Sequence, residues 1–223
     1  MDVVVAGAHG QIARRLTRAL TAAGHTVTGI VRNPDHRADI ERDGARAAVL
    51  DLEQASLDDV AAVLRGADAV VFAAGAGPVS GVSRKDAVDR AAAGLLADAA
   101  EQAGVRRYLL VSSMGTESVR DGAEPEGVDE VFLAYLRAML AAEDDLRRRA
   151  LDWVVLRPGG LTDDAATGTV TLAALVDRGQ VTRDDVAAVI AALLPTPDVS
   201  RQVLEVVGGD VPVDEAVRTA VTR

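Results

Sequence analysis

Two closely spaced glycines follow the first apolar run of the chain. Val3–Ala6 is continuously apolar, Gly7 and Gly10 come directly after it, and a helical pattern begins at Ile12. A strand that turns tightly into a helix points the free N–H groups of the first helical turn, and the positive end of the helix dipole, at one spot. Gly7 permits the turn, and Gly10 lets a ligand approach the backbone. The segment therefore predicts a site for the pyrophosphate of a dinucleotide.

The glycine spacing is Gly7-x-x-Gly10-x-x-Ala13 and not the more familiar G-x-G-x-x-G. Ala13 is small enough for the helix to pack closely on the strand. Taken alone, the motif also fits a purely structural turn between a strand and a helix. The residues that follow decide between the two interpretations.

A cation stands at the end of the second predicted strand, 26–31. In a βαβ dinucleotide-binding unit, the residue at this place meets the adenine ribose. An acidic residue would accept a hydrogen bond from the 2′-hydroxyl of NAD, whereas Arg32 matches the 2′-phosphate of NADP. We therefore predict NADP(H) in preference to NAD(H); the alternative is a solvated arginine at a strand end.

Strands and helices alternate along the chain. This alternation predicts an α/β fold of Rossmann type, with a doubly wound, mostly parallel sheet and helices on both faces. We expect 1–223 to form a single domain with a small C-terminal elaboration, about 161–223. Further strands are predicted at 47–50, 67–74, 107–112, 153–156 and 203–207, and helices at 12–22, 56–64, 83–103, 128–150, 182–194 and 213–221.

Ligands of such sheets bind at the carboxyl ends of the strands. Six candidate residues close or follow a strand, so we expect them to converge on one edge: Gly7, Arg32, Asp51, Ala74, Ser112 and Pro158.

Three segments are less regular. Residues 35–45 form a polar, weakly helical connection, and 170–175 fits either a short strand or a helix. Residues 116–127 are acidic and rich in glycine and proline, which indicates a loop. This loop could be a substrate lid or an ordinary surface loop.

Composition excludes several kinds of partner. The net charge of −10 argues against nucleic acid, and no apolar run is long enough to span a membrane. Strand residues begin at once and leave no room for a signal peptide, so we expect a cytoplasmic protein. No His, Asp or Glu grouping has metal-ligand spacing, and cysteine is absent. We expect a monomer or homodimer that acts on a small molecule.

Several blocks together resemble the atypical short-chain dehydrogenase/reductase family, in particular its compact NmrA-like and biliverdin-reductase-B-like members. They are VVVAGAHGQIARRL, GHTVTGIVRNP, DLE, VFAAGAG, AAEQAGVRRYLLVSS, LDWVVLRPGGLT and VTRDDVAAVIAALL, which cover nearly the whole chain in the expected order. The resemblance implies an NADP-binding Rossmann domain.

The resemblance also implies roles for individual residues. His9 departs from the threonine usual at its position, so it either donates to phosphate or is an exposed loop histidine. Gly7, Ala8, His9, Gly10, Gln11 and Ile12 are expected at the pyrophosphate, Arg32 and Asn33 at the 2′-phosphate, Asp51 and Leu52 at the adenine, Ala73, Ala74 and Gly75 at the ribose, and Ser112, Pro158, Gly159 and Gly160 near the nicotinamide.

Family members that reduce carbonyl groups carry Tyr-x-x-x-Lys and a serine at the preceding strand end. Here Ser113 and Tyr135 are the catalytic candidates, but Met139 occupies the lysine position. A tyrosine of pKa about 10 would have to be lowered by about three units to work near pH 7, which a thioether cannot do. Met139, and Tyr135 with it, can equally be residues of the core.

Three functions remain open. The first is an NADPH-dependent reductase of a conjugated acceptor such as a quinone or flavin, for which no Tyr-Lys pair is needed. The second is a non-catalytic NADP sensor of NmrA-like type. The third is a structural protein with a vestigial dinucleotide site.

Overall fold

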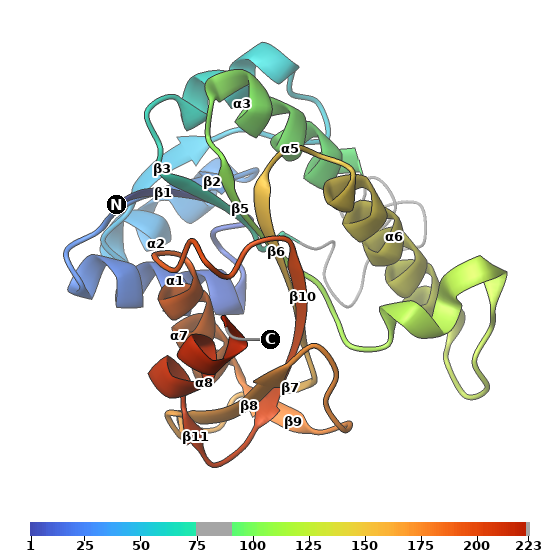
Figure 1. Cartoon of the computed structure of the whole chain (residues 1–223). Coiled ribbons are helices and arrows are strands. Elements are labelled where there is room, and N and C mark those ends of the chain that lie inside the picture. Colours follow the sequence, from blue (N-terminus) through green and yellow to red (C-terminus); the bar gives the residue numbers. More distant parts are fainter. Residues whose placement is uncertain (75–90, 222–223) are drawn as a thin grey trace.

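The central sheet has nine strands in the order β11-β8-β10-β6-β5-β4-β1-β2-β3. The computed structural model describes residues 1–74 and 91–221 (Figure 1). Among the described strands only β8 runs antiparallel to its neighbours, so the sheet is mostly parallel as predicted. The strands are β1 Asp2–Ala6, β2 Thr26–Val31, β3 Arg46–Val49, β4 Ala69–Phe72, β5 Arg107–Val111, β6 Asp152–Pro158, β8 Thr169–Ala173, β10 Gln202–Gly208 and β11 Val211–Pro212.

The strand order reverses at β1, which pairs with β2 on one side and β4 on the other. Such a reversal leaves a crevice at the carboxyl ends of the strands, because the following connections leave toward opposite faces of the sheet. The predicted doubly wound topology is confirmed.

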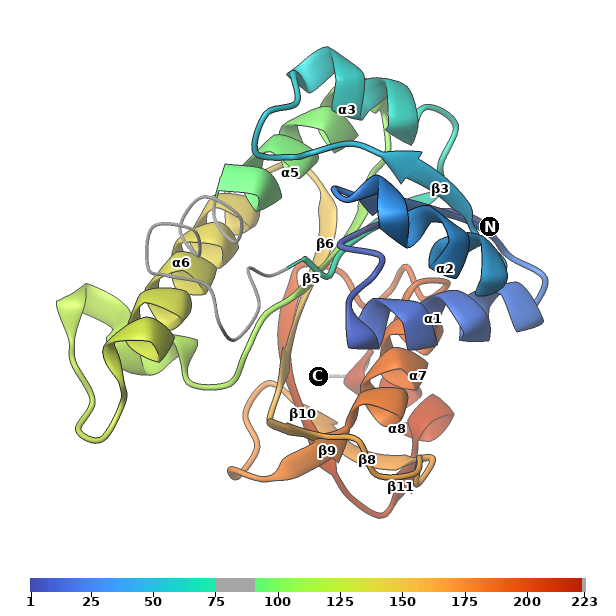
Figure 2. The ribbon, with the colours of Figure 1, turned by 180° about the vertical axis from the view of Figure 1, so that it is seen from behind.

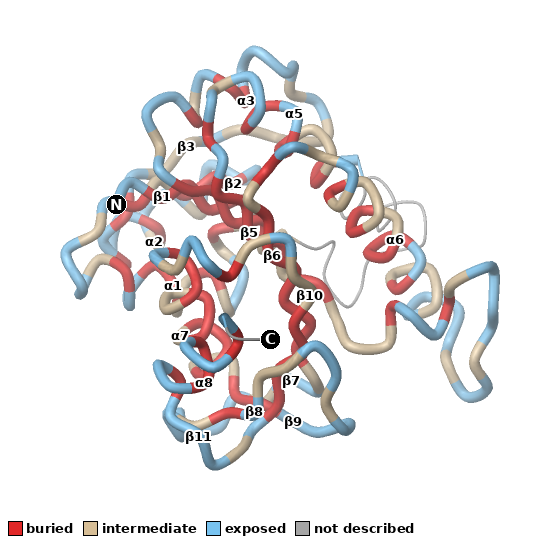
Figure 3. The backbone as a smooth tube through the Cα atoms, in the orientation of Figure 1, coloured by how far each residue is buried: buried red, intermediate tan, exposed pale blue. Residues whose placement is uncertain are grey.

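Helices cover both faces of the sheet (Figure 2). Alternate residues of β1 point to opposite faces, as the two-residue period of a strand requires. Val3 and Val5 join one core cluster with Leu16, whereas Val4 joins the other with Leu96. Buried residues follow the sheet and the inner helix surfaces (Figure 3). One face carries α1 Gln11–Ala22, α7 Arg183–Leu193 and α8 Val213–Ala220, and the other carries α3 Leu57–Leu64, α5 Ala92–Ala103 and α6 Glu130–Arg147.

Two irregular segments contain more helix than expected. Residues 35–45 include the 3₁₀ helix η1 (Pro34–His36) and the short helix α2 (Arg37–Arg42). The predicted loop 116–127 begins with the 3₁₀ helix η3 (Thr116–Gly122), so that prediction is wrong for its first half. The reason is packing: Val119 is buried in a small apolar cluster with α6.

One predicted helix begins later than expected, and the start of another is not described. Asp129 caps α6 by accepting hydrogen bonds from the backbone N–H groups of Val131 and Phe132, so the helix starts at Glu130 and not at 128. The predicted start of the helix over 83–103 lies outside the described residues.

The C-terminal region resolves the ambiguous segment 170–175 as strand β8. It also holds an unpredicted parallel pair, β7 (Gly160–Thr162) and β9 (Gln180–Thr182). Asp185 of α7 joins these elements, because its buried carboxylate accepts hydrogen bonds from the backbone N–H groups of Thr167 and Gly168 and from the Thr182 hydroxyl. Burial opposes the charge on Asp185, but these donors together lower its pKa. No described helix is long and apolar enough to cross a bilayer.

Candidate functional site: two cavities at the carboxyl edge of the sheet

The first cavity, about 300 Å³ in volume, opens where β1, β2, β3 and β4 end. It brings together residues that are far apart in the sequence but follow neighbouring strands of the sheet, as we predicted from their positions at strand ends. Its wall contains the following predicted residues: Gly7, His9, Gly10, Arg32, Asn33, Asp51, Leu52, Ala73 and Ala74.

The amino end of α1 faces this cavity without a side-chain cap. Its N-cap residue is Gly10, which has no side chain to cap the helix, and the first turn of α1 has no acidic residue. Three other helices satisfy their first turns internally: Ser56 caps α3, Asp129 caps α6 and Thr182 caps α7. The first turn of α1 therefore offers its N–H groups and dipole to an anion.

Gly7 holds the turn against the end of β4. Its φ is +76°, and a Cβ at this position would lie 2.4 Å from the Ala74 Cα. The Gly10 N–H donates to the Gly7 carbonyl at 2.8 Å and closes the turn. The cradle is thus formed by backbone that no larger residue could occupy.

Arg32 lies on the rim of the first cavity, as predicted, but it is ion-paired. Its guanidinium donates to Glu53 Oε1 at 2.7 Å. Glu53 lines the same cavity, so the predicted phosphate-binding cation and a carboxylate share this rim. The Asn33 side chain accepts a hydrogen bond from the Asp35 N–H and caps η1.

His9 also lines the first cavity, but its ring has structural partners. Its Nε2 lies 3.0 Å from the Asp39 carboxylate, and the ring stacks on His36 at 3.6 Å. The hydrogen bonds from His9 and Arg42 lower the pKa of Asp39. A histidine–carboxylate pair orients the ring and ties the glycine turn to α2.

The other predicted residues of the glycine segment have different places. Ala8 is fully buried and faces the backbone of Gly29, and Ile12 packs against the core. Gln11 is exposed, and its carbonyl accepts a hydrogen bond from Arg15. Gly75 lies outside the described residues.

The second cavity, about 510 Å³, lies beside the ends of β5 and β6. The segments after these strands are locked together, since the Met114 N–H donates to the Pro158 carbonyl at 3.0 Å. Both catalytic candidates and the predicted nicotinamide-side residues are on its wall: Ser112, Ser113, Tyr135, Pro158, Gly159 and Gly160.

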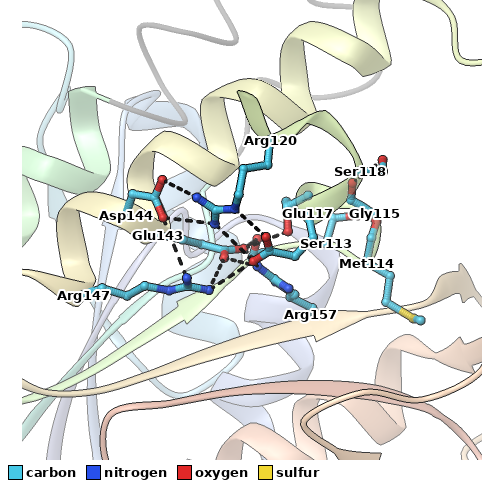
Figure 4. A network of polar contacts seen from close by, with 12 residues as sticks. Ser113, Met114, Gly115, Glu117, Ser118, Arg120, Glu143, Asp144, Arg147 and Arg157 are labelled. Atoms are coloured by element: carbon cyan, nitrogen blue, oxygen red, sulfur yellow. Dashed lines mark hydrogen bonds and ion pairs between the residues drawn. The ribbon is translucent and has the colours of Figure 1, made fainter. Parts of the chain in front are cut away.

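Ser112 lines this cavity, and its hydroxyl is used as a donor within the protein. Its Oγ donates to Glu143 Oε1 at 2.5 Å. Glu143 is fully buried and also accepts from Thr116 and Arg157 (Figure 4). Ser112 therefore ties the end of β5 to α6. The Ser113 hydroxyl donates to the Met114 carbonyl at 3.1 Å.

An ion-pair network extends from the Glu143–Arg157 pair to the surface (Figure 4). Arg157 bridges Glu143 and Glu117, and the hydrogen bonds from Arg120 and Arg157 hold the pKa of Glu117 down at about 2. The network fastens η3 onto α6 and β6. Ser118 of η3 and the N-cap residue Gly115 line the second cavity. The members of the network are Glu117, Arg120, Glu143, Asp144, Arg147 and Arg157.

Tyr135 is partly buried and stacks on Phe132 with ring centroids 5.8 Å apart. Met139 is 1% exposed and lies in the core, one helical turn from Tyr135. Arg137 points elsewhere and pairs with Glu124 at 2.9 Å. The position that would carry a lysine is thus filled by an apolar core residue.

Sequence reasoning missed five charged residues that line these cavities or belong to the ion-pair network beside the second one. Glu143 could have been suspected, because it follows Tyr135 and Met139 at the same four-residue interval on one helix face. The pairing of Arg32 with Glu53, and the placement of two arginines beside β9, depend on tertiary contacts that no local pattern encodes. The five are Glu53, Glu143, Arg157, Arg178 and Arg183.

Known proteins match this arrangement over the whole chain. The profile of a family described as NAD(P)H-binding matches residues 7–197, which include both cavities. The chain belongs to this family. Its members bind a nicotinamide cofactor, and an uncapped helix terminus above a glycine turn fits the pyrophosphate of that cofactor.

Individual relatives agree. A Bacillus subtilis protein named "Uncharacterized sugar epimerase YhfK" is 32% identical and covers 98% of this chain and 99% of its own. A Bacillus halodurans structure named "Putative NAD-dependent epimerase/dehydratase" is 34% identical and has a TM-score of 0.88. The match covers 98% of this chain and 99% of that structure. ChuY from Escherichia coli O157:H7, named an anaerobilin reductase, has 28% identity and a TM-score of 0.80, with coverage of 95% and 98%. The chain is an NAD(P)H-binding, oxidoreductase-type protein of atypical short-chain dehydrogenase/reductase kind.

Proposed function

We propose that the chain is an NADPH-dependent reductase of a conjugated acceptor such as a quinone or flavin. The observation that carries this proposal is the uncapped first turn of α1, which faces the first cavity with Arg32 on its rim. A relative named as a reductase supports reduction as the reaction class.

Residues of both cavities would contact different parts of the cofactor. Gly7, Gly10 and the first turn of α1 would hold the pyrophosphate. Arg32 would bind the 2′-phosphate once its guanidinium is shared with or released from Glu53. Asp51, Leu52, Ala73 and Ala74 would border the adenosine, and Ser112 with 158–160 would border the nicotinamide.

The second cavity would hold the acceptor. Bound NADPH supplies a hydride, and water supplies the proton that completes reduction of the acceptor. Phe132, Tyr135 and Leu136 provide an apolar wall on which a planar ring system can lie, and the chain's task is to position it. Met139 in the lysine position disfavours Tyr135 as a proton donor.

The test is an acceptor screen that follows NADPH absorbance. We expect oxidation with menadione or FMN and little with a simple ketone such as cyclohexanone. Ser113→Ala and Tyr135→Phe should change kcat with menadione by less than about 5-fold, because removal of a true general acid costs about 10²–10⁴-fold. A loss of that larger size in either variant would contradict a water-supplied proton.

A second candidate is an NADP-binding sensor without turnover, which the buried Met139 also favours. Its signature is tight NADPH binding with no oxidation by any acceptor. Absence of NADPH and NADH binding would overturn both candidates.

A further inference from the structure

The charges that line the second cavity are all of one sign. Among the described residues on its wall, only Arg178 and Arg183 are charged at neutral pH, and no carboxylate is present. This is unexpected, since the chain has 34 acidic and 24 basic residues. The positive charge of this cavity is therefore a local property and is opposite in sign to the net charge of the chain.

The two arginines flank strand β9, which brings them to the cavity. β9 pairs in parallel with β7, with Gly160 opposite Gln180, and the Gly160 N–H donates to the Gly179 carbonyl at 2.9 Å. The approach is tight, because a Cβ on Gly159 would lie 2.4 Å from the Gly179 oxygen. Arg178 and Arg183 are thus fixed to the segment that follows Pro158.

Their positive charge is only partly compensated. Arg183 lies 3.0 Å from Asp163, but Asp163 is also shared with Arg15 at 3.3 Å and is itself 59% exposed. Arg178 makes no ion pair within the described ranges 1–74 and 91–221. An anion in the cavity would therefore meet donors that are not fully used within the protein.

The opposite wall is apolar and aromatic. This side is formed by α6: Phe132 is 42% exposed and stacks with Tyr135. The second cavity thus combines a flat apolar side with a cationic side. Such a site selects a molecule that has both a conjugated body and an anionic group.

We infer that the acceptor carries an anionic group, a carboxylate or a phosphate, which Arg178 and Arg183 bind while its conjugated part lies on Phe132 and Tyr135. This inference rests on the proposed function and names the class of its acceptor.

The test uses pairs of acceptors that share a conjugated ring system and differ in whether they carry an anionic group. One pair is a naphthoquinone with a propionate side chain and its methyl ester; the other is FMN and riboflavin. For each pair we compare kcat/KM from NADPH oxidation, and Kd by calorimetry in the presence of NADP⁺. The anionic member should be favoured by about 10-fold or more, as expected for a charge-assisted contact. The pair with the larger ratio identifies carboxylate or phosphate as the natural group.

Variants then assign the preference to the arginines. Arg178→Gln and Arg183→Gln should each bring the ratio close to 1, and Arg178→Lys should restore part of it. Arg148→Gln, which alters a 72% exposed arginine of the α6 C-terminus, is the matched control and should leave the ratio unchanged.

The outcomes separate the two proposals. Reduction of neutral and anionic members with equal efficiency supports the proposed function and overturns this inference. Tighter binding of the anionic member that depends on Arg178, without any NADPH oxidation, supports the anion site and overturns the reductase. If Arg178→Gln and Arg183→Gln weaken NADPH binding and leave the ratio unchanged, the arginines serve the dinucleotide and the inference is wrong.

Discussion

The two cavities both lie at the carboxyl edge of the sheet, but they differ in whether backbone or side chains form most of the wall. Backbone and small residues after β1 and β4 form much of the first cavity, with Gly7 pressed against Ala74. Larger side chains of α6 and of the β7–β9 region form much of the second, and the buried ion pair Glu143–Arg157 lies next to it, beneath η3.

This difference suggests that the cofactor site is common to the family, whereas the acceptor site varies from one member to the next. A backbone cradle depends on glycines and strand order, so chains that share both features offer a dinucleotide the same place. A side-chain wall changes with each substitution, so the acceptor is the property of the individual protein. Variants around the first cavity should therefore change cofactor binding, and variants of the network beside the second should change stability. Four predictions test this division.

The largest effect is expected from Glu143→Leu. It leaves Arg157 buried without its main partner, which costs about 3–5 kcal/mol of unfolding free energy. The measurement is chemical denaturation. The control is Asp144→Leu on the same helix, a 32% exposed residue paired with Arg120 and Arg147, for which we expect about 1 kcal/mol or less. Equal losses in both variants would show that burial does not strengthen the network.

The second-largest effect is expected from Gly7→Ala, which alters the backbone of the first cavity. The left-handed backbone costs about 1–2 kcal/mol and the clash with Ala74 about 1–3 kcal/mol more, so NADPH affinity and stability should both fall. Gly66→Ala is the control, because Gly66 has a φ of +80° but nothing within 4 Å of an added Cβ. NADPH titration and thermal unfolding distinguish the clash from the backbone cost; identical results for the two variants would rule out the tight approach.

The Arg32–Glu53 pair predicts a change in cofactor preference. Arg32→Glu should weaken NADPH about 10- to 100-fold and NADH only slightly, because it places a like charge at the 2′-phosphate. Glu53→Gln should strengthen NADPH about 3-fold by releasing Arg32 from its partner. Titrations with both nucleotides measure the preference. Equal changes for NADPH and NADH in Arg32→Glu would mean that Arg32 does not contact the 2′-phosphate.

The smallest effect concerns pH. The folded pKa of Glu117 is about 2, below its ordinary value of 4.5, so its stabilising contribution is complete above pH 4.5 and disappears as the pH falls toward 2. Since its side chain is 47% exposed, we expect only about 1 kcal/mol. Glu117→Gln should be less stable than wild type at pH 6 but equally stable near pH 2. Exposed Glu126→Gln is the control; a difference between wild type and Glu117→Gln that persists at pH 2 would contradict the titration.

The sequence was sufficient for the fold and for the position of the first cavity. Apolar runs, glycine turns and strand alternation are local signals, and parallel topology carries Gly7, Arg32 and Ala74 to one edge. It was not sufficient for the partners of those residues. Glu53 meets Arg32, and Glu143 meets Ser112, only through tertiary packing. The 3₁₀ turn at 116–122 was missed for the same reason, since its order depends on contacts with α6.

Arg32 has a consequence for how selective this protein can be. A 2′-phosphate bound at Arg32, as we propose, would compete with the Glu53 carboxylate for the same guanidinium. The discrimination between the phosphorylated and unphosphorylated nucleotide is then a difference between two ion pairs, one replacing the other. Ionic strength weakens both pairs together. A chain built in this way would keep a modest but salt-tolerant preference, and it could draw on either nucleotide pool as their concentrations change.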